Sequence, residues 1–191
     1  MIRNPGRIGF SGLAGSGKDT AANVAHNALG DLTNVRRAFA EPLKAAATLL
    51  GWTGSKEMDD PMGRPFLDYF GQAMRAYDPE FWITQAWMAE WDLRQGSASP
   101  EHLCFIYSDV RFPNEAEYIQ KDGGLLIHIE RFSVMQLDLE SERHNDYLAS
   151  IADCIISNDS TPRIFAARVL DNIERLTHTI VHEDHELGGE G

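Results

Sequence analysis

The sequence has little of the positive charge that binding to a large polyanion requires. Lys and Arg together number 17, against 29 Asp and Glu, and the formal net charge at pH 7 is −12. A chain this acidic repels duplex DNA and anionic lipid surfaces, because both are bound through a basic face. The composition therefore argues against a duplex nucleic acid partner. A small anionic ligand, held by a local group of arginines, is still compatible with it.

Cysteine and long apolar runs are also scarce. The two cysteines, Cys104 and Cys154, lie in apolar stretches and form neither a CxxC pair nor a disulfide framework, so we expect two buried thiols. No apolar run approaches the ~18 residues of a membrane span. The glycine-rich start does not have the pattern of a signal peptide. We therefore expect a cytoplasmic protein with no membrane partner.

Short apolar runs alternate with helix-period segments along the chain. This alternation predicts an α/β fold of three layers, in which helices cover both faces of a five-stranded parallel sheet. The expected strands lie at 7–10, 35–40, 103–108, 125–130 and 154–157. The expected helices lie at 18–29, 42–50, 65–77, 79–94, 114–123 and 162–176.

Two segments depart from this alternation within what we expect to be a single domain over residues 1–191. One is a helical insertion at about 41–96, and the other is a charged connection at about 131–147. Ligands of open α/β sheets bind beyond the carboxyl ends of the strands, so both segments are expected to border the site. The acidic tail at 182–191 is expected to be loose.

Several conspicuous residue groups have a structural explanation. Asn114 and Glu117 have the spacing of a capping box at a helix start. The aromatic residues of 66–91 mostly have helical spacing and are expected in a core, with Trp82 or Phe70 as a candidate to stack on a nucleobase. A histidine group near the end of the chain is expected to be solvated rather than a metal site, and it comprises His178, His182 and His185.

A glycine-rich loop of the form G-x-x-x-x-G-K lies directly between the first expected strand and helix. Glycines let the backbone wrap around an anion, and the amide groups of residues 13–20 then point inward beside the positive end of the helix. Lys18 reaches the outer phosphates of a nucleotide. The pattern predicts a loop that binds ATP, made by Gly12, Leu13, Ala14, Gly15, Ser16, Gly17, Lys18, Asp19 and Thr20.

An acid replaces the Ser or Thr that usually follows the lysine of such a loop. Asp19 beside a triphosphate would repel it unless Mg²⁺ lay between them. Asp19 therefore either holds magnesium, through water, or turns outward as a first-turn acid of the helix. Thr20 is the expected phosphate or magnesium contact. Asp109 is a third candidate magnesium ligand, because it lies at the end of the third expected strand.

Arginines gather in the two departing segments and at strand ends. A phosphoryl-transfer site must neutralise several negative charges around the moving group, and one lysine is not enough. The arginines placed on the expected ligand edge are Arg64, Arg75, Arg111, Arg131 and Arg143.

Five stretches, taken in order, resemble the deoxynucleoside monophosphate kinases of tailed bacteriophages. They are FSG…GKDT (10–20), FAEPLK (39–44), SDVR (108–111), IHIER (127–131) and DCIISND (153–159), with a related arm segment from Arg64 to Trp82. The resemblance implies a P-loop kinase fold with an acceptor-binding helical arm and a short lid over 131–147. It also implies in-line transfer of the γ-phosphoryl group of ATP to a deoxynucleoside 5′-monophosphate, with Mg²⁺ and without a covalent intermediate.

The resemblance also implies roles for individual residues. Lys18, Asp109, Arg111 and Arg131 would act in catalysis, and Asn158 would lie near the adenine. The acceptor would be bound by Lys44, Arg64, Arg75, Trp82, Arg111 and Arg143.

The residues leave alternatives open. One is a related small-molecule kinase, such as a dephospho-coenzyme A or ribonucleotide kinase. Another is a nucleotide-binding switch that transfers nothing. The preferred base and the formation of a homodimer are open as well.

Overall fold

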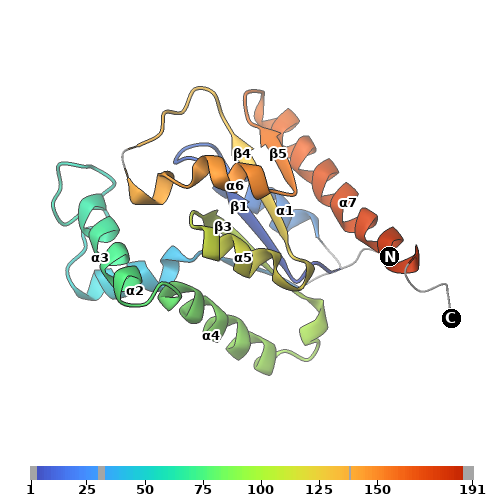
Figure 1. Ribbon diagram of the computed structural model, residues 1–191, viewed down its shortest axis with the longest axis horizontal. Helices are drawn as coiled ribbons and strands as arrows, with labels where there is room; N and C mark the ends of the chain where they lie inside the picture. The colour runs from blue at the N-terminus through green and yellow to red at the C-terminus, as the bar shows by residue number, and fades with distance from the viewer. Residues whose placement is uncertain (1–3, 30–32, 138, 187–191) are drawn as a thin grey trace.

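The centre of the molecule is one sheet of five parallel strands in the order β2-β3-β1-β4-β5. The computed structural model describes residues 4–29, 33–137 and 139–186. Helices cover both faces of the sheet (Figure 1), which confirms the predicted three-layer α/β fold. The strands are β1 Arg7–Ser11, β2 Thr33–Arg37, β3 Leu103–Val110, β4 Leu125–Glu130 and β5 Cys154–Ser157.

Two apolar cores lie on the two faces of the sheet. Alternate residues of a strand point to opposite faces, so Cys104 and Ile106 of β3 enter one core while Phe105 and Tyr107 enter the other. Burial on both faces explains why the central strands are nearly continuous apolar runs. The first core lies against α1 (Lys18–Ala28) and α7 (Pro162–Glu186), and the second against α4 (Phe81–Gly96), α5 (Pro113–Gln120) and α6 (Asn145–Ile151).

A helical arm extends from one end of the sheet, on the left in Figure 1. It comprises α2 (Ala40–Leu49), α3 (Arg64–Tyr77) and the beginning of α4. Glu90 fixes α4 to the sheet: its buried carboxylate accepts hydrogen bonds from Arg7 Nε at 3.0 Å, from Arg7 Nη2 at 2.9 Å and from the Tyr107 hydroxyl at 2.8 Å. This buried, fully paired charge anchors the arm at its base.

The carboxyl ends of the three central strands meet at one edge of the sheet. Ser11, the last residue of β1, lies opposite Val110 of β3 and His128 of β4. The glycine-rich loop follows Ser11 directly, so it emerges between the segments that follow β3 and β4.

Some element boundaries differ from the sequence prediction. β2 ends at Arg37 rather than at 40, because Phe39 already caps α2, which begins at Ala40, two residues before the expected start. The helix expected at 114–123 begins at Pro113, and the Glu115 carboxylate caps it by accepting the backbone N–H of Phe112, so the expected Asn114–Glu117 capping box is not the one that forms the start. Asn114 donates instead to the Pro79 carbonyl and the Glu80 carboxylate.

The charged connection and the tail also contain more helix than expected. Residues 131–147 include the 3₁₀ turn η3 (Glu140–Glu142) and the start of α6. The backbone of α7 continues to Glu186, so much of the expected loose tail is helical. Residues 187–191, and the side chains of the histidine group at 178–185, lie outside the described part of the chain.

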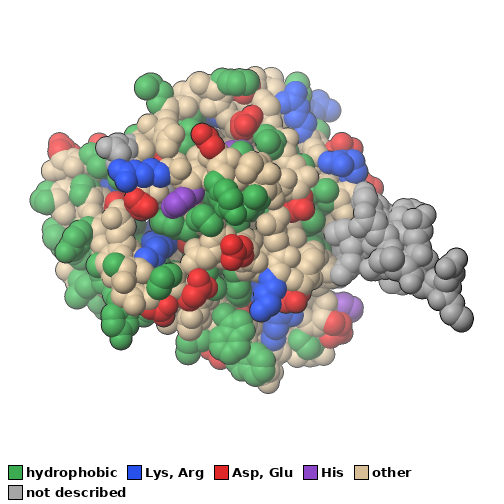
Figure 2. Space-filling model, in the orientation of Figure 1, with side chains coloured by type: hydrophobic (Ala, Val, Ile, Leu, Met, Phe, Trp, Pro, Cys, Tyr) green, Lys and Arg blue, Asp and Glu red, His purple; other side chains and the backbone are tan. Residues whose placement is uncertain are grey.

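The surface is of mixed charge on the face seen in Figure 2, where acidic and basic side chains are interspersed among apolar ones. Within the described ranges, no helix is both long and apolar enough to cross a bilayer. Cys104 is buried, Cys154 is half-buried, and both are unbridged.

The anchor at Glu90 gives the first prediction. Glu90→Ala leaves the Arg7 guanidinium and the Tyr107 hydroxyl without their acceptor in a buried site, and we expect a loss of about 3 kcal/mol in the free energy of unfolding. Urea unfolding measures it. Asp92→Ala removes an exposed acid of the same helix and is the control. Equal stabilities of the two variants would contradict the anchor.

Candidate active site

The phosphate loop has a backbone shape that excludes side chains at its first glycine. Gly12 has φ of +135°, and a Cβ there would lie 2.3 Å from the Ile129 carbonyl oxygen of the next strand. The loop thus lies directly against β4. From the other side, the Asn158 amide group donates to the Ser16 carbonyl at 2.8 Å. Contacts from two neighbouring segments therefore hold the loop in its curve.

Two side chains of the loop are suited to a phosphate group. The Ser16 hydroxyl is buried and has no hydrogen-bond partner. Lys18 is also buried, and its Nζ donates to the carbonyl oxygens of Gly12 at 2.7 Å and Leu13 at 2.6 Å. Burial, with a smaller contribution from Arg111, lowers the pKa of Lys18 to about 8. An unpartnered buried donor beside a buried cation fits an anionic ligand.

The structure distinguishes between the two orientations expected for Asp19. Its side chain is 84% exposed and pairs with Arg36 at 3.4 Å. Asp19 is therefore the outward, first-turn acid of α1. Thr20 is exposed as well.

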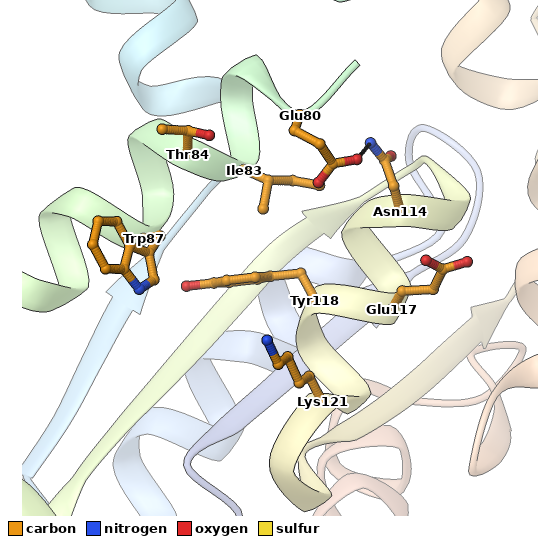
Figure 3. A pocket seen from close by; sticks show the side chains of 8 residues that line it. All are labelled: Glu80, Ile83, Thr84, Trp87, Asn114, Glu117, Tyr118 and Lys121. Carbon is orange, nitrogen blue, oxygen red and sulfur yellow. Dashed lines mark hydrogen bonds between the residues drawn. The ribbon is translucent and has the colours of Figure 1, made fainter. Parts of the chain in front are cut away.

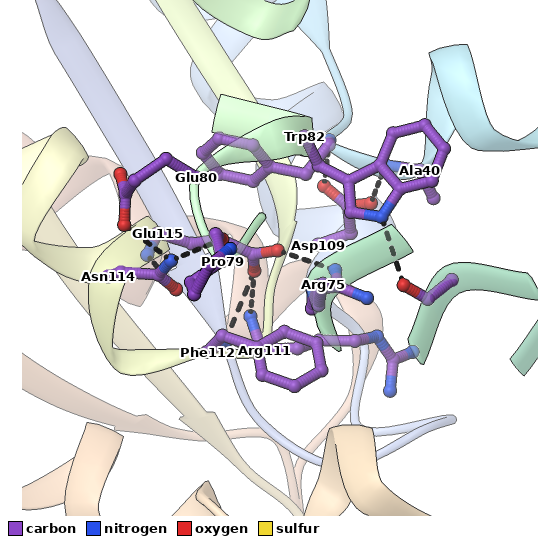
Figure 4. Close-up of polar contacts among 12 residues, drawn as sticks. Ala40, Arg75, Pro79, Glu80, Trp82, Asp109, Arg111, Phe112, Asn114 and Glu115 are labelled. Carbon is purple, nitrogen blue, oxygen red and sulfur yellow. Dashed lines mark hydrogen bonds and ion pairs between the residues drawn. The ribbon is translucent and has the colours of Figure 1, made fainter. Parts of the chain in front are cut away.

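Asp109 holds the start of the helical arm. Its two carboxylate oxygens accept the backbone N–H groups of Phe39 at 2.8 Å and Ala40 at 2.9 Å (Figure 4). The end of β3 is thereby joined to the N-terminus of α2, where a negative charge is favoured. Among the described residues, no group of three or more His, Cys, Asp or Glu side chains is arranged to hold a metal ion.

Glu115 joins two of the arginines expected on the ligand edge, Arg75 and Arg111. One oxygen accepts a hydrogen bond from Arg75 Nη2 at 3.0 Å, and the other accepts the backbone N–H groups of Arg111 at 2.8 Å and Phe112 at 3.2 Å (Figure 4). Burial raises the pKa of Glu115 to about 7, against the opposite effect of Arg75, while the charge of Asp109 adds to the rise. Glu115 had no predicted role, although Pro113 marks the start of the helix and places Glu115 in its first turn, where an acid is favoured.

A cavity of about 570 Å³ lies beside Arg75 and Phe112. The Arg75 guanidinium lies over the Phe112 ring, 3.8 Å from its centroid, and the His144 ring lies 5.5 Å from the same ring. The cavity is therefore bordered by a cation, by aromatic rings, by amide groups and by three carboxylates (Glu80, Glu117 and Glu140), which come from the arm, α5 and the lid segment (residues 131–147). Its lining includes Gln72, Arg75, Phe112, Asn114, Glu140 and His144.

Trp82 does not border this cavity, which corrects one expectation. The indole ring is buried, and its Nε1 donates to the Gly71 carbonyl at 3.2 Å. Its edge contacts with Phe70 and Phe81 make it part of the core between α3 and α4. The helical spacing of the aromatic residues indicated such a core, and Phe112 is the ring that faces the cavity.

The remaining predicted site residues lie on several different elements and differ in how exposed they are. Arg64 begins α3, and Lys44 is exposed on α2. Arg131 is exposed directly after β4. Arg143 pairs with Glu140 at 3.2 Å on the lid segment. Asn158 lies against the phosphate loop, as described above.

Two buried residues near the loop had no predicted role. His128 lies 3.0 Å from the Ser11 hydroxyl, and burial, with Lys18 nearby, lowers its pKa to about 4. Glu142 of the lid segment reaches the loop itself: its Oε1 accepts the Ala14 backbone N–H at 2.9 Å and lies 3.7 Å from Arg111 Nη1.

A second cavity, of about 360 Å³, lies between α4 and α5 (Figure 3). Trp87 and Tyr118 border it together with the charged side chains of Glu117 and Lys121. It shares Glu80, Asn114 and Glu117 with the 570 Å³ cavity, so the two cavities adjoin each other on either side of these residues.

Comparison with known proteins agrees with this geometry. No protein-family profile matches the chain. A protein of Acanthamoeba polyphaga mimivirus, provisionally named a deoxynucleotide monophosphate kinase, is 27% identical over 87% of this chain and 95% of its own length. An uncharacterised protein of Ictalurid herpesvirus 1 (strain Auburn) is 29% identical over 85% of this chain and 68% of its own. A gluconokinase from Sinorhizobium meliloti 1021 superimposes with a TM-score of 0.53 at 11% identity, covering 95% of this chain and 98% of that one.

The fold is that of the P-loop kinases. The superposition and the sheet order carry this assignment, and the phosphate loop lies where that fold has it, between β1 and α1. The two relatives by sequence come from a mimivirus and a herpesvirus, so a bacteriophage source stays a prediction from the resemblance.

Glu115 gives a prediction about pH. The native protein binds the Glu115 proton more tightly than the unfolded chain does, so this group stabilises the fold at low pH and loses that contribution as the pH rises from 4.5 through about 7. Glu115→Gln should remove this part of the pH dependence. Urea unfolding across that range measures it, with the exposed Glu117→Gln as control. Parallel pH profiles for wild type and Glu115→Gln would refute it.

Proposed function

We propose that the chain transfers the terminal phosphoryl group of ATP to a deoxynucleoside 5′-monophosphate. One observation carries the proposal: a chain of contacts joins the phosphate loop to the 570 Å³ cavity. Glu142 contacts the loop and the Arg111 guanidinium, and Glu115 accepts the Arg111 backbone N–H and pairs with Arg75 of the cavity. A transferable phosphate at the loop and an acceptor in the cavity would thus meet at Arg111. The name given to the mimivirus relative supports a nucleotide as the acceptor.

The nucleotide end of the site would be formed by the loop. Its amide groups, the unpartnered Ser16 hydroxyl and the Lys18 ammonium group are donors for the phosphate oxygens. A ligand phosphate would draw Lys18 from the Gly12 and Leu13 carbonyl oxygens that it now contacts. Arg131 at the base of the lid segment and Asn158 behind the loop would border the rest of the nucleotide.

The acceptor end would be formed by the cavity. Its volume falls in the range of small-molecule sites. The rings of Phe112 and His144 would border a base, and Gln72, whose amide group now donates to Asp68, would lie near its edge. Arg75 and Arg111 would bind the acceptor phosphate, and Lys44, Arg64 and Arg143 would add positive charge around it.

The residues present fit magnesium through water. Mg²⁺ in kinase sites is held largely by substrate phosphates and water, with one or two carboxylates. Each Asp109 oxygen accepts one N–H group and keeps further acceptor capacity for a metal-bound water. With Asp19 turned outward, Asp109 is the acid we assign to this role. The ion supplies charge neutralisation at the phosphates.

Catalysis would consist of positioning and electrostatic stabilisation. Lys18 and Arg111 neutralise the charge that develops on the transferred group, and Glu115 holds the Arg111 backbone in place. The helical arm and the lid segment enclose the two ligands, so that water does not compete with the acceptor phosphate as a nucleophile.

The loss of the loop cation gives a test of the proposed reaction. Lys18→Ala should lower turnover at least about 10³-fold while the fold persists, because a buried charge at the transferred group is lost. Formation of deoxynucleoside diphosphate from each of four monophosphates, ATP and Mg²⁺ measures it. Lys121→Ala, at the far end of α5, is the control. Undiminished turnover in Lys18→Ala would refute the assignment.

The same assay separates the alternatives. A ribonucleotide or another small phosphorylated acceptor that reacts in place of every deoxynucleotide would make the chain a related small-molecule kinase. Slow ATP hydrolysis that no monophosphate accelerates would favour a nucleotide-binding switch.

Arg75→Lys gives a second test. A lysine keeps the positive charge but loses the planar fork and the stacking on Phe112, so we expect the KM for the monophosphate to rise about tenfold with the KM for ATP unchanged. Steady-state kinetics measure both, with the exposed Arg168→Lys of α7 as control. A rise in the KM for ATP alone would place Arg75 outside the acceptor site.

A further inference from the structure

Glu142 places a carboxylate at the point where the phosphate loop faces the acceptor side. The residue is only 2% exposed although it belongs to the lid segment. Its Oε1 accepts the Ala14 backbone N–H at 2.9 Å and lies 3.7 Å from Arg111 Nη1. Its Oε2 accepts the Leu137 backbone N–H at 2.6 Å. The carboxylate thus bridges the loop, the lid segment and the arginine at the end of β3.

These partners are the ones that a phosphate oxygen would use. A loop amide and a guanidinium group both bind phosphate through charge-assisted hydrogen bonds, and a buried carboxylate between them has the same charge sign and acceptor geometry. An anion in this position is therefore an internal substitute for a phosphoryl group.

Glu142 uses only the early part of the loop. The Ser16 hydroxyl has no partner, and Lys18 Nζ contacts loop carbonyl oxygens. These donors lie closer along the chain to α1 than Ala14 does, so they remain available to the phosphates of a nucleotide while Glu142 is in place. Only the outermost phosphoryl group, the one that faces Arg111, would compete with Glu142 for its position.

We propose that Glu142 occupies the position of the transferable phosphoryl group until a nucleoside triphosphate displaces it. This makes Glu142 a residue that determines how the loop discriminates between a triphosphate and a diphosphate. The proposal rests on the proposed function, because it takes the space between the loop and Arg111 as the place of transfer. The displacement is a competition between two anions for the same N–H and guanidinium groups.

The lid segment would move with Glu142. The turn around Glu142 is held together by its own contacts: the Glu142 N–H donates to the Leu139 carbonyl at 2.9 Å, and Gln136 Nε2 donates to the Glu142 carbonyl at 2.9 Å. Entry of a third phosphate therefore shifts this turn as a unit, and the position of the lid reports which nucleotide the loop holds.

Calorimetric titration of MgADP and of a non-hydrolysable ATP analogue with Mg²⁺ tests the proposal. Glu142→Gln removes the charge with little change in shape. We expect the affinity of this variant for the ATP analogue to rise about tenfold, because the third phosphate no longer has to displace the Glu142 carboxylate from the loop. The affinity for ADP should change much less. Asp146→Asn makes the same charge change within the lid segment, on an exposed carboxylate, and should alter neither affinity.

A shorter acid gives an independent measurement. Glu142→Asp keeps the charge but draws it back by one methylene group. Its affinity for the ATP analogue should therefore lie between the affinities of wild type and Glu142→Gln. Thermal unfolding of each variant confirms that it is folded at the titration temperature.

The other outcomes overturn the proposal in distinguishable ways. An equal gain for ADP and the ATP analogue would place Glu142 over the inner phosphates, and no gain, or a loss, would make it a structural contact of the lid. If no nucleotide binds to wild type or to any variant, both this proposal and the proposed function fail. If the analogue binds with the expected dependence on Glu142 but no monophosphate is phosphorylated, only the proposed function fails.

Discussion

Backbone N–H groups that converge at one edge of the sheet are the constraint on which this site depends. The chain there supplies many donors and few acceptors of its own, because strands end and helices begin at the same place. Three buried or partly buried carboxylates accept these donors. Asp109 takes two at the start of α2, Glu115 takes two between β3 and α5, and Glu142 takes one from the phosphate loop. The acidity of the chain is thus part of how its anion site is built.

The same pairings place positive groups without exposing them. Glu115 holds Arg75 by its side chain and Arg111 by its backbone, so the two guanidinium groups have set positions relative to the loop. Arg75 is further constrained by the ring of Phe112. A protein with a net charge of −12 can therefore present a local cationic surface to a small anion and still repel a polyanion.

What the sequence could predict was local. The phosphate loop is a continuous motif with strand and helix on either side, and the five parallel strands follow from apolar runs at regular spacing, so both were predicted correctly. The start of α5 was misplaced because Asn114–Glu117 and Phe112–Glu115 have the same spacing, and only the fold shows which pair has the buried acid. Trp82 was misassigned because helical spacing alone does not show which rings face a cavity.

Contacts between distant parts of the chain were beyond such reasoning. Ala14 and Glu142 are 128 positions apart, and Glu142 lies in a charged stretch that has no periodic pattern. Asp109 was placed correctly at the end of its strand, yet the identity of its partners depends on how α2 packs. Residues that hold a site together across the fold leave no signature at fixed spacing.

The place of β1 in the middle of the sheet has a consequence for tolerance to change. β1 leads into the loop, β3 on one side leads into Arg111 and α5, and β4 on the other leads into the lid segment. A shift of β1 by one residue against either neighbour would exchange the side chains that it presents to the two helix layers. It would also move the backbone N–H groups of the phosphate loop about 3.3 Å along the strand direction. Insertions and deletions should accordingly be tolerated at the outer strands β2 and β5 long before they are tolerated within residues 7–11.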